Sequence, residues 1–256
     1  IDLIEGSVED LSIKKNKIKG VELRGGQVLC CNSVVLTTGT FLRGVIRVGN
    51  KSVQAGRVGD KPSIALAKKI EELKFSIGRL KTGTPPRILK KSINFNDLEE
   101  QLPDKIPKPF SFINNVIHTP QVPCFITHTN AKTHKIISDN LEMSPMYSGA
   151  IQSMGARYCP SIEDKVVRFP DKNNHQIFLE PEGLSSNLIY PNGISSSLPE
   201  NIQEHFVKSI KGLENAIITQ PAYAIEYDYI NPQELLHTLE TKKIKNLFFA
   251  GQINGT

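Results

Sequence analysis

One cysteine among charged side chains is the feature of this sequence that best predicts chemistry. Cys159 lies between Arg157 and Lys165 in a segment rich in charged residues. A cysteine attacks as its thiolate, and neighbouring cations favour that form. An inert structural cysteine is the usual alternative, but it is normally surrounded by apolar residues. We therefore predict that Cys159 is a nucleophile with Arg157 and Lys165 as its charge partners.

A second run with the composition of a binding site spans residues 78–87. It holds three cations, two threonines and two glycines. Backbone amides freed by glycine, with Lys and Arg nearby, are typical of phosphate or carboxylate binding. A solvated turn is the alternative. We predict a binding loop, stiffened by its proline pair, in which Lys81, Thr82 and Arg87 contact the substrate.

A third polar cluster contains His128, Asn130 and His134. The two histidines would share a face if this segment were one continuous strand. We can place no third ligand beside them, so we predict no metal site. The expected role of His128 and Asn130 is hydrogen bonding to a substrate.

Residues 224–229 alternate apolar with acidic or aromatic side chains, which predicts a strand with Glu226 and Asp228 on one face. Two interpretations stay open. The face is solvated, or the carboxylates and neighbouring tyrosines bind a flipped nucleobase. The runs 180–183 and 190–195 have the Pro and Gly content of structural turns.

Composition limits the elements that must position these residues. The 256 residues are 39% hydrophobic and 22% charged, which fits a soluble globular protein. No apolar run approaches the roughly 18 residues of a membrane-spanning helix. The four cysteines lack disulfide or zinc spacing, which indicates a reducing compartment. The net charge of +5 permits a polyanionic partner without requiring one. The chain opens within a predicted strand and without Met, so we expect a fragment.

Hydrophobic periodicity predicts the elements. We expect strands at 3–11, 33–41 and 246–251, a hairpin of 17–23 with 27–30 that turns at Gly25-Gly26, helices at 63–73, 199–211 and 231–239, and an exposed loop at 90–109. The fold class is α/β with an α+β insertion. Residues 1–46 and 221–256 are predicted to form one domain, and residues 47–220 a second, mixed-sheet domain inserted into it.

Several runs together resemble one protein family over essentially the whole chain. They are residues 38–44, 78–87, 144–149, 155–169, 190–195 and 249–256. In these runs the sequence is similar to the glucose-inhibited division protein A family of tRNA uridine 5-carboxymethylaminomethyl modification enzymes.

The resemblance implies a fold, cofactors and partners. It implies part of a glutathione-reductase-like FAD-binding domain, with NADH and methylene-tetrahydrofolate as co-substrates. The reaction would build a carboxymethylaminomethyl or aminomethyl group on carbon 5 of the wobble uridine of tRNA. Family members work with a tRNA-modifying GTPase and are typically homodimers. We expect a cytoplasmic enzyme without membrane attachment, and we expect the fragment alone to be inactive.

The resemblance also implies site residues. Val8, Ser63 and Gln252 fall where the family contacts FAD, and Gly39 and Thr40 end a strand typical of flavoproteins. The run 155–169 falls where the family is expected to bind NAD, and Cys159 matches a family cysteine implicated in catalysis. The NAD prediction rests on Gly155, Tyr158, Ser161, Glu163, Asp164 and Phe169.

The sequence departs from the family pattern in several places. It holds no Gly-x-Gly-x-x-Gly fingerprint for the FAD pyrophosphate and lacks the second implicated cysteine. Ala156 stands where proline is usual, and Arg47 where histidine is frequent. Two alternatives are kept: a folate- and FAD-dependent tRNA uridine methyltransferase, which should lack the 155–169 run, and a non-catalytic tRNA- or nucleotide-binding fragment, which would bind no flavin.

Overall fold

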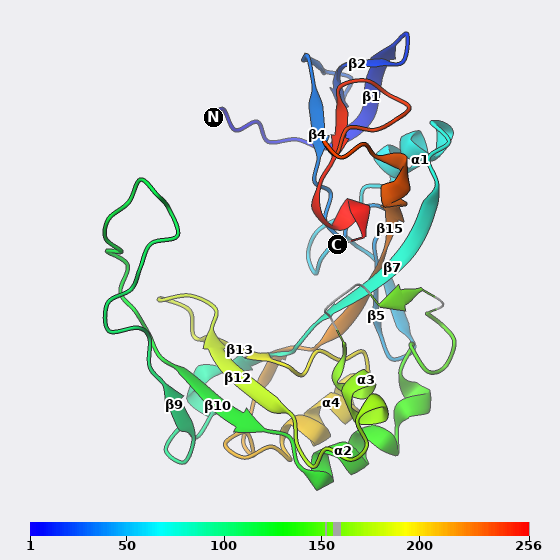
Figure 1. The fold of residues 1–256 in the computed structure, drawn as a ribbon. Coiled ribbons are helices and arrows are strands. Elements are labelled where there is room, and N and C mark those ends of the chain that lie inside the picture. The colour runs from blue at the N-terminus through cyan, green and yellow to red at the C-terminus, as the bar shows by residue number, and fades with distance from the viewer. Residues whose placement is uncertain (152, 156–159, 256) are drawn as a thin grey trace.

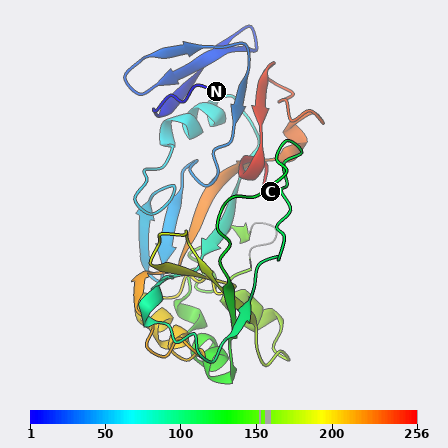
Figure 2. The ribbon, with the colours of Figure 1, turned by 90° about the vertical axis from the view of Figure 1, so that its left-hand side faces the viewer.

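The computed structural model describes residues 1–151, 153–155 and 160–255 and has an α/β fold. Both chain ends lie in an upper body, and the middle of the sequence builds a lower body (Figure 1). Two long paired strands, β7 (Ile77–Thr84) and β15 (Tyr223–Ile230), connect the bodies. Figure 2 shows the same division from the side.

The upper body joins segments from the two ends of the sequence. Its strands are β1 (Val8–Lys14), β2 (Lys17–Leu23) and β3 (Val28–Cys30) in one antiparallel sheet, and β4 (Val34–Leu36) paired in parallel with β16 (Leu247–Phe249). Helix α1 (Ile64–Glu72) buries Leu66, Ala67 and Ile70 in the same core. This core therefore uses a helix from the range predicted as the inserted domain.

The central sheet has five strands in the order β11-β7-β15-β5-β6. Besides β7 and β15 it contains β5 (Val45–Val48), β6 (Lys51–Gln54) and β11 (Met154–Gly155). Strand β11 pairs in parallel with β7, and the other pairs are antiparallel. The sheet places β11, which comes just before the predicted cysteine site, beside β7.

The lower body has a six-stranded antiparallel sheet and three helices around one apolar core. The strands are β8 (Arg87–Leu89), β9 (Glu99–Gln101), β10 (Cys124–His128), β12 (Gln176–Pro181), β13 (Leu188–Asn192) and β14 (Ile218–Gln220). The helices are α2 (Ala131–Ser138), α3 (Ile162–Arg168) and α4 (Glu200–Val207). Capping boxes begin α2 at Asn130 and α3 at Ser161, because each side chain accepts a bond from a first-turn amide.

Three local predictions were wrong. Residues 78–87 form most of β7 and the start of β8 rather than a loop, because pairing with β15 outweighs the local Gly and Pro content. His128 ends β10 whereas His134 lies within helix α2, so they share no continuous strand. The runs 180–183 and 190–195 include the ends of β12 and β13 rather than turns alone.

The two ends of the chain also differ from expectation. Residues 1–7 are exposed and without regular structure, and the first strand begins at Val8. The predicted helix at 231–239 is a short 3-10 turn, Pro232–Glu234, followed by a bridge between Leu235 and Thr241. Leu235 packs into the upper core, whereas Leu236 and Leu239 are exposed. The helix was predicted from three leucines on one buried face. Because only Leu235 of the three is buried, the segment needs no helix to place it in the core.

The remaining helical turns are 3-10 segments at Lys90–Ser92, Leu141–Met143 and Gly251–Asn254. The predicted hairpin of β2 with β3, helix α1 and strand β15 are confirmed within one or two residues of their expected ends. Across the described ranges, no helix has the length and apolar character needed to cross a membrane.

Candidate functional site

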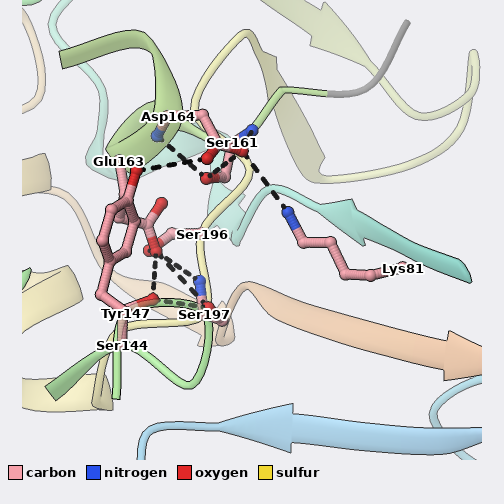
Figure 3. Close-up of polar contacts among 8 residues, drawn as sticks. All are labelled: Lys81, Ser144, Tyr147, Ser161, Glu163, Asp164, Ser196 and Ser197. Atoms are coloured by element: carbon pink, nitrogen blue, oxygen red, sulfur yellow. Dashed lines mark hydrogen bonds and ion pairs between the residues drawn. The ribbon is translucent and has the colours of Figure 1, made fainter. Parts of the chain in front are cut away.

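Asp164 is the centre of a polar cluster where β7, α3 and the segment after the Leu141–Met143 turn meet (Figure 3). Its Oδ2 accepts bonds from Ser161 N and Ser161 Oγ, both at 3.1 Å. Lys81 Nζ lies 3.7 Å from the same oxygen, and Tyr147 OH donates to Oδ1 at 3.3 Å. The cluster therefore fixes the start of α3 just after the predicted cysteine segment.

Tyr147 stays protonated in this cluster. Burial, followed by the negative charge of Asp164, raises the pKa of Tyr147 to about 12. At neutral pH its hydroxyl is therefore a hydrogen-bond donor to Asp164.

Glu163 is the second acidic residue of the site, and it is fully buried. Its Oε1 accepts bonds from Ser196 Oγ at 3.1 Å and Ser197 N at 3.0 Å, and Ser144 Oγ lies at 3.4 Å. Its Oε2 is buried and has no hydrogen-bond partner among the described residues. The Glu163 carboxylate thus ties α3 to two loops, and one of its oxygens is not used in that contact (Figure 3).

The expected strand face of Glu226 and Asp228 exists, but it is not solvated. Glu226 accepts from Arg47 Nε at 2.7 Å and from Ser153 Oγ at 3.0 Å. Asp228 is 2% exposed and accepts from Arg79 at 2.8 Å. Packing covers this face of the central sheet, and arginines neutralise its carboxylates. The interpretation as a solvated strand is therefore wrong.

The predicted substrate residues do not form one loop. Lys81 is 1% exposed and paired with Asp164, whereas Thr82 lies on the opposite face of β7 because neighbouring strand residues alternate. Arg87 bonds the Glu182 carboxylate and stacks 4.6 Å above the Tyr190 ring. Their roles in substrate binding stay predictions.

The polar cluster around His134 belongs to helix capping and packing. Asn130 Oδ1 accepts from Thr133 N at 3.0 Å, and Asn130 Nδ2 donates to Ser209 O at 2.7 Å. His134 Nε2 lies 2.7 Å from Thr129 Oγ1, and its ring is 5.2 Å from that of His175. His128 is exposed at the end of β10.

Both histidines of this pair favour the neutral form. Burial lowers the pKa of His134. Burial also lowers the pKa of His175, and the charge of His134 lowers it further. The described residues contain no group of three His, Cys, Asp or Glu side chains that could hold a metal ion.

Two predicted FAD residues line one cavity of about 420 Å³ between the first strand and the start of α1. Val8 and Ser63 are both on its wall, with the cations Arg24 and Lys61. A cavity of 300 to 1,000 Å³ is typical of cofactor sites. Arg24 is paired with Glu9 of the same wall at 2.6 Å, and Lys61 is a second cation that could contact the phosphates of a nucleotide cofactor.

Gly39 and Gln252, also predicted to contact FAD, lie next to each other. Gly39 has φ +53°, and a Cβ atom placed on it would lie 3.6 Å from Gln252 Oε1. Thr40 Oγ1 donates to Gly56 O at 2.7 Å. The left-handed φ at Gly39 explains why glycine suits this strand end.

The predicted NAD residues divide into two groups. Tyr158 lies outside the described residues, as do Arg157 and Cys159, which were predicted to be catalytic. Ser161, Glu163 and Asp164 direct their side chains into the bonds given above, and Gly155 belongs to β11. Phe169 is half exposed at the end of α3, and Lys165 Nζ donates to Gly193 O at 2.9 Å. Contact with NAD stays a prediction for Gly155, Tyr158, Ser161, Glu163, Asp164 and Phe169. The catalytic roles of Cys159, Arg157 and Lys165 also stay predictions.

Sequence reasoning did not assign roles to Ser144, Tyr147, Ser196 and Ser197. They come from two loops far apart in the sequence that meet at α3. Their runs are polar and contain proline, which signals a turn but gives no sign of a shared partner.

The protein has an α/β fold. Its central sheet places Lys81 of β7 against the buried carboxylate of Asp164 on α3. All of its residues, 1–256, match the family described as Glucose inhibited division protein A. The chain belongs to that family.

Individual relatives agree with this assignment. The chain is 54% identical over 259 residues to the tRNA uridine 5-carboxymethylaminomethyl modification enzyme MnmG of Granulibacter bethesdensis, covering 100% of this chain and 41% of that protein. Two crystal forms of Aquifex aeolicus GidA match with TM-scores of 0.89 and 0.88 at 49% and 48% identity. Each match covers 98% of this chain, and 43% and 41% of the Aquifex chains. The chain thus spans about two fifths of the length of these relatives.

Proposed function

We propose that this chain is part of an enzyme that installs a carboxymethylaminomethyl or aminomethyl group on carbon 5 of the wobble uridine of tRNA. The observation that carries the proposal is the 54% identity over the whole chain to a relative named for that modification. The alternative of a tRNA uridine methyltransferase has no comparable support, because no observation on the described residues favours it.

FAD is the proposed cofactor of the upper body. Its support is the cavity of about 420 Å³ lined by Val8, Ser63 and two cations, together with the adjacent Gly39 and Gln252. The parallel pairing of β4 with β16 supports a flavin domain assembled from both ends of the sequence, with the lower body as its insertion. Bound FAD would supply the redox chemistry of the reaction. The chain's own residues would hold its phosphates and exclude water.

NADH and methylene-tetrahydrofolate are the proposed co-substrates. The proposed partners are a tRNA-modifying GTPase and a second copy of the chain. These assignments follow from the family resemblance. Cytoplasmic location belongs to the same proposal. Cys159 is the proposed nucleophile, with Arg157 and Lys165 favouring its thiolate.

The proposal is tested on the full-length protein in two steps. Its visible spectrum is recorded with FAD, before and after NADH is added without oxygen. Bleaching of the flavin bands is expected. A bound flavin that NADH does not reduce would remove NADH from the proposal, and a colourless protein would favour the non-catalytic nucleotide-binding alternative.

The second step measures modified uridine in tRNA by mass spectrometry of nucleosides. Loss of the modification is expected for Cys159→Ser, because serine is a much weaker nucleophile. A matched control is Cys30→Ser, at an exposed cysteine on β3 in the upper body. Full modification by the Cys159 variant would exclude the nucleophilic role.

A further inference from the structure

A basic surface at the top of the upper body takes no part in the site described above. Seven exposed lysines gather there from two distant segments, four from residues 14–19 and three from residues 242–245. The segments are in contact, because Ile18 N donates to Lys245 O at 3.0 Å and Lys245 N donates to Asn16 O at 2.8 Å. The β1–β2 turn and the loop before β16 therefore lie side by side (Figure 1).

The strand register places four of these lysines on one face. Lys14 pairs with Lys17 across the hairpin, and Lys17 forms a bridge with Lys245. Paired residues of neighbouring strands project to the same side, with Cβ atoms about 5 Å apart. Lys19 shares the face of Lys17, because Ile18 between them is fully buried in the upper core. We call these four side chains the lysine row.

The local structure does not explain this charge. Like charges directly opposite each other on paired strands are destabilising, and among the described residues no acid forms an ion pair with the lysine row. The acids of the adjoining loop have other partners, because Glu234 pairs with Lys243 at 3.2 Å and Glu240 accepts from Asn246 N at 2.6 Å. An uncompensated row of cations indicates an anionic partner.

The turn between the two strands does not require lysine either. Lys15 has φ +51°, a left-handed conformation that Gly and Asn adopt more easily than lysine does. A fifth exposed ammonium thus adjoins the lysine row at a position where the backbone favours an uncharged residue.

We infer that the lysine row binds the phosphate backbone of tRNA. The inference rests on the proposed function for the identity of the polyanion. A lysine that neutralises a phosphate releases a condensed counterion, which favours binding without reading the base sequence. The ammonium groups lie side by side on an exposed face, so they suit an extended chain of phosphates better than a single phosphate ion. The row adjoins Lys14 at the end of β1, whereas the proposed FAD cavity adjoins Val8 at its start.

The test measures the affinity of the full-length protein for an unmodified tRNA transcript by fluorescence anisotropy, at salt concentrations from about 50 to 200 mM. The row variant replaces all four lysines by glutamine: Lys14→Gln, Lys17→Gln, Lys19→Gln and Lys245→Gln. Its dissociation constant is expected to rise at least about tenfold, and its log–log salt slope to become shallower by about 3, because each phosphate contact contributes roughly 0.7 to 0.9. Its melting temperature should not fall, since the variant removes only like-charge contacts.

A matched control removes the same charge from the lower body, at four exposed lysines: Lys105→Gln, Lys108→Gln, Lys132→Gln and Lys211→Gln. It should change the dissociation constant by less than about twofold, because these lysines are not part of the row. Equal losses in the two variants would overturn the inference, since they would reflect net charge alone. Wild-type affinity and salt slope in the row variant would also overturn it.

Vesicles of phosphatidylcholine with phosphatidylserine test the other extended polyanion. Loss of vesicle binding by the row variant, with unchanged tRNA affinity, would assign the lysine row to a membrane surface and overturn the inference. A wild-type protein that binds no tRNA would overturn the proposed function and the inference together. Equal tRNA binding by the wild type and the row variant would overturn the inference alone.

Discussion

At the scale of single residues, the buried carboxylates of Glu163 and Asp164 organise the polar cluster. Glu163 accepts bonds from two loops through one oxygen, and Asp164 gathers a lysine, a serine and a tyrosine. A buried acceptor that is removed leaves its donors unsatisfied, at roughly 1 to 3 kcal/mol for each. Replacing either side chain is therefore expected to lower the stability of the protein and to displace the residues of the polar cluster.

Replacing Glu163 by Ala should lower the free energy of unfolding by about 3 kcal/mol, because Ser196 Oγ and Ser197 N lose their acceptor in the interior. Urea denaturation of the wild type and the variant measures the difference. Glu72→Ala, at an exposed glutamate in the last turn of α1, is the control and should leave the midpoint unchanged. If Glu163→Ala lowers the free energy of unfolding no more than the control does, the hydrogen bonds to Glu163 do not stabilise the fold.

The neutral pair of His134 and His175 should make stability depend on pH. Their pKa values are lowered in the folded protein. Between those lowered values and the ordinary His pKa of about 6.5, the unfolded chain binds more protons. The contribution of the two neutral histidines to the free energy of unfolding is therefore fully present above about pH 6.5. It decreases as the pH falls below that value. Unfolding free energies from pH 5 to 8 measure this slope.

The double variant His134→Gln with His175→Gln should flatten that slope, whereas His237→Gln, at an exposed histidine, should keep it. A slope unchanged in the double variant would assign the pH dependence to other groups.

At the scale of elements, caps and strand pairing decide the local structure. Asn130 begins α2 and also reaches Ser209, just beyond α4, so one side chain fixes both the start of a helix and its position against another. Strand β7 forms in spite of two glycines because β15 pairs with it along its whole length. Long-range pairing outweighs the local preference there.

Asn130→Ala should lower the free energy of unfolding by about 1 to 2 kcal/mol through loss of the α2 cap. Thermal or urea denaturation checks this value. The control is Asn201→Ala, at an exposed position in α4 that has no cap to lose. If the variant keeps wild-type stability but loses tRNA binding, the original prediction of substrate contact by Asn130 is the better one.

At the scale of the whole molecule, the central sheet links a body made from both ends of the chain with a body made from its middle (Figure 1). The polar cluster lies beside the strands that connect them, and the cavity lined by Val8 and Ser63 lies in the upper body.

Ser63→Trp should weaken FAD binding at least tenfold, because the large ring would fill the cavity beside Val8. Ser63 makes no side-chain cap bond to α1, so helix stability should change little. Flavin bound per chain, measured by absorbance after dialysis of the full-length protein, is the readout. Ser52→Trp, at an exposed position in β6, is the control. Unchanged FAD binding in Ser63→Trp would show that the flavin does not bind in this cavity.

The sequence by itself determined the elements whose signal is local. The β2–β3 hairpin, α1 and β15 followed from turn residues and periodicity, because a period of 2 or 3.6 is written in adjacent residues. It also determined the family, through runs distributed over the whole chain.

Only the tertiary structure decided what covers each face and which distant loops meet. Alternation placed Glu226 and Asp228 on one face, but whether that face was solvated depended on packing and on arginines from other strands. The same holds for Ser144, Ser196 and Ser197, which share Glu163 as a partner. Burial and convergence arise from contacts between residues far apart in the chain, and no local pattern records them.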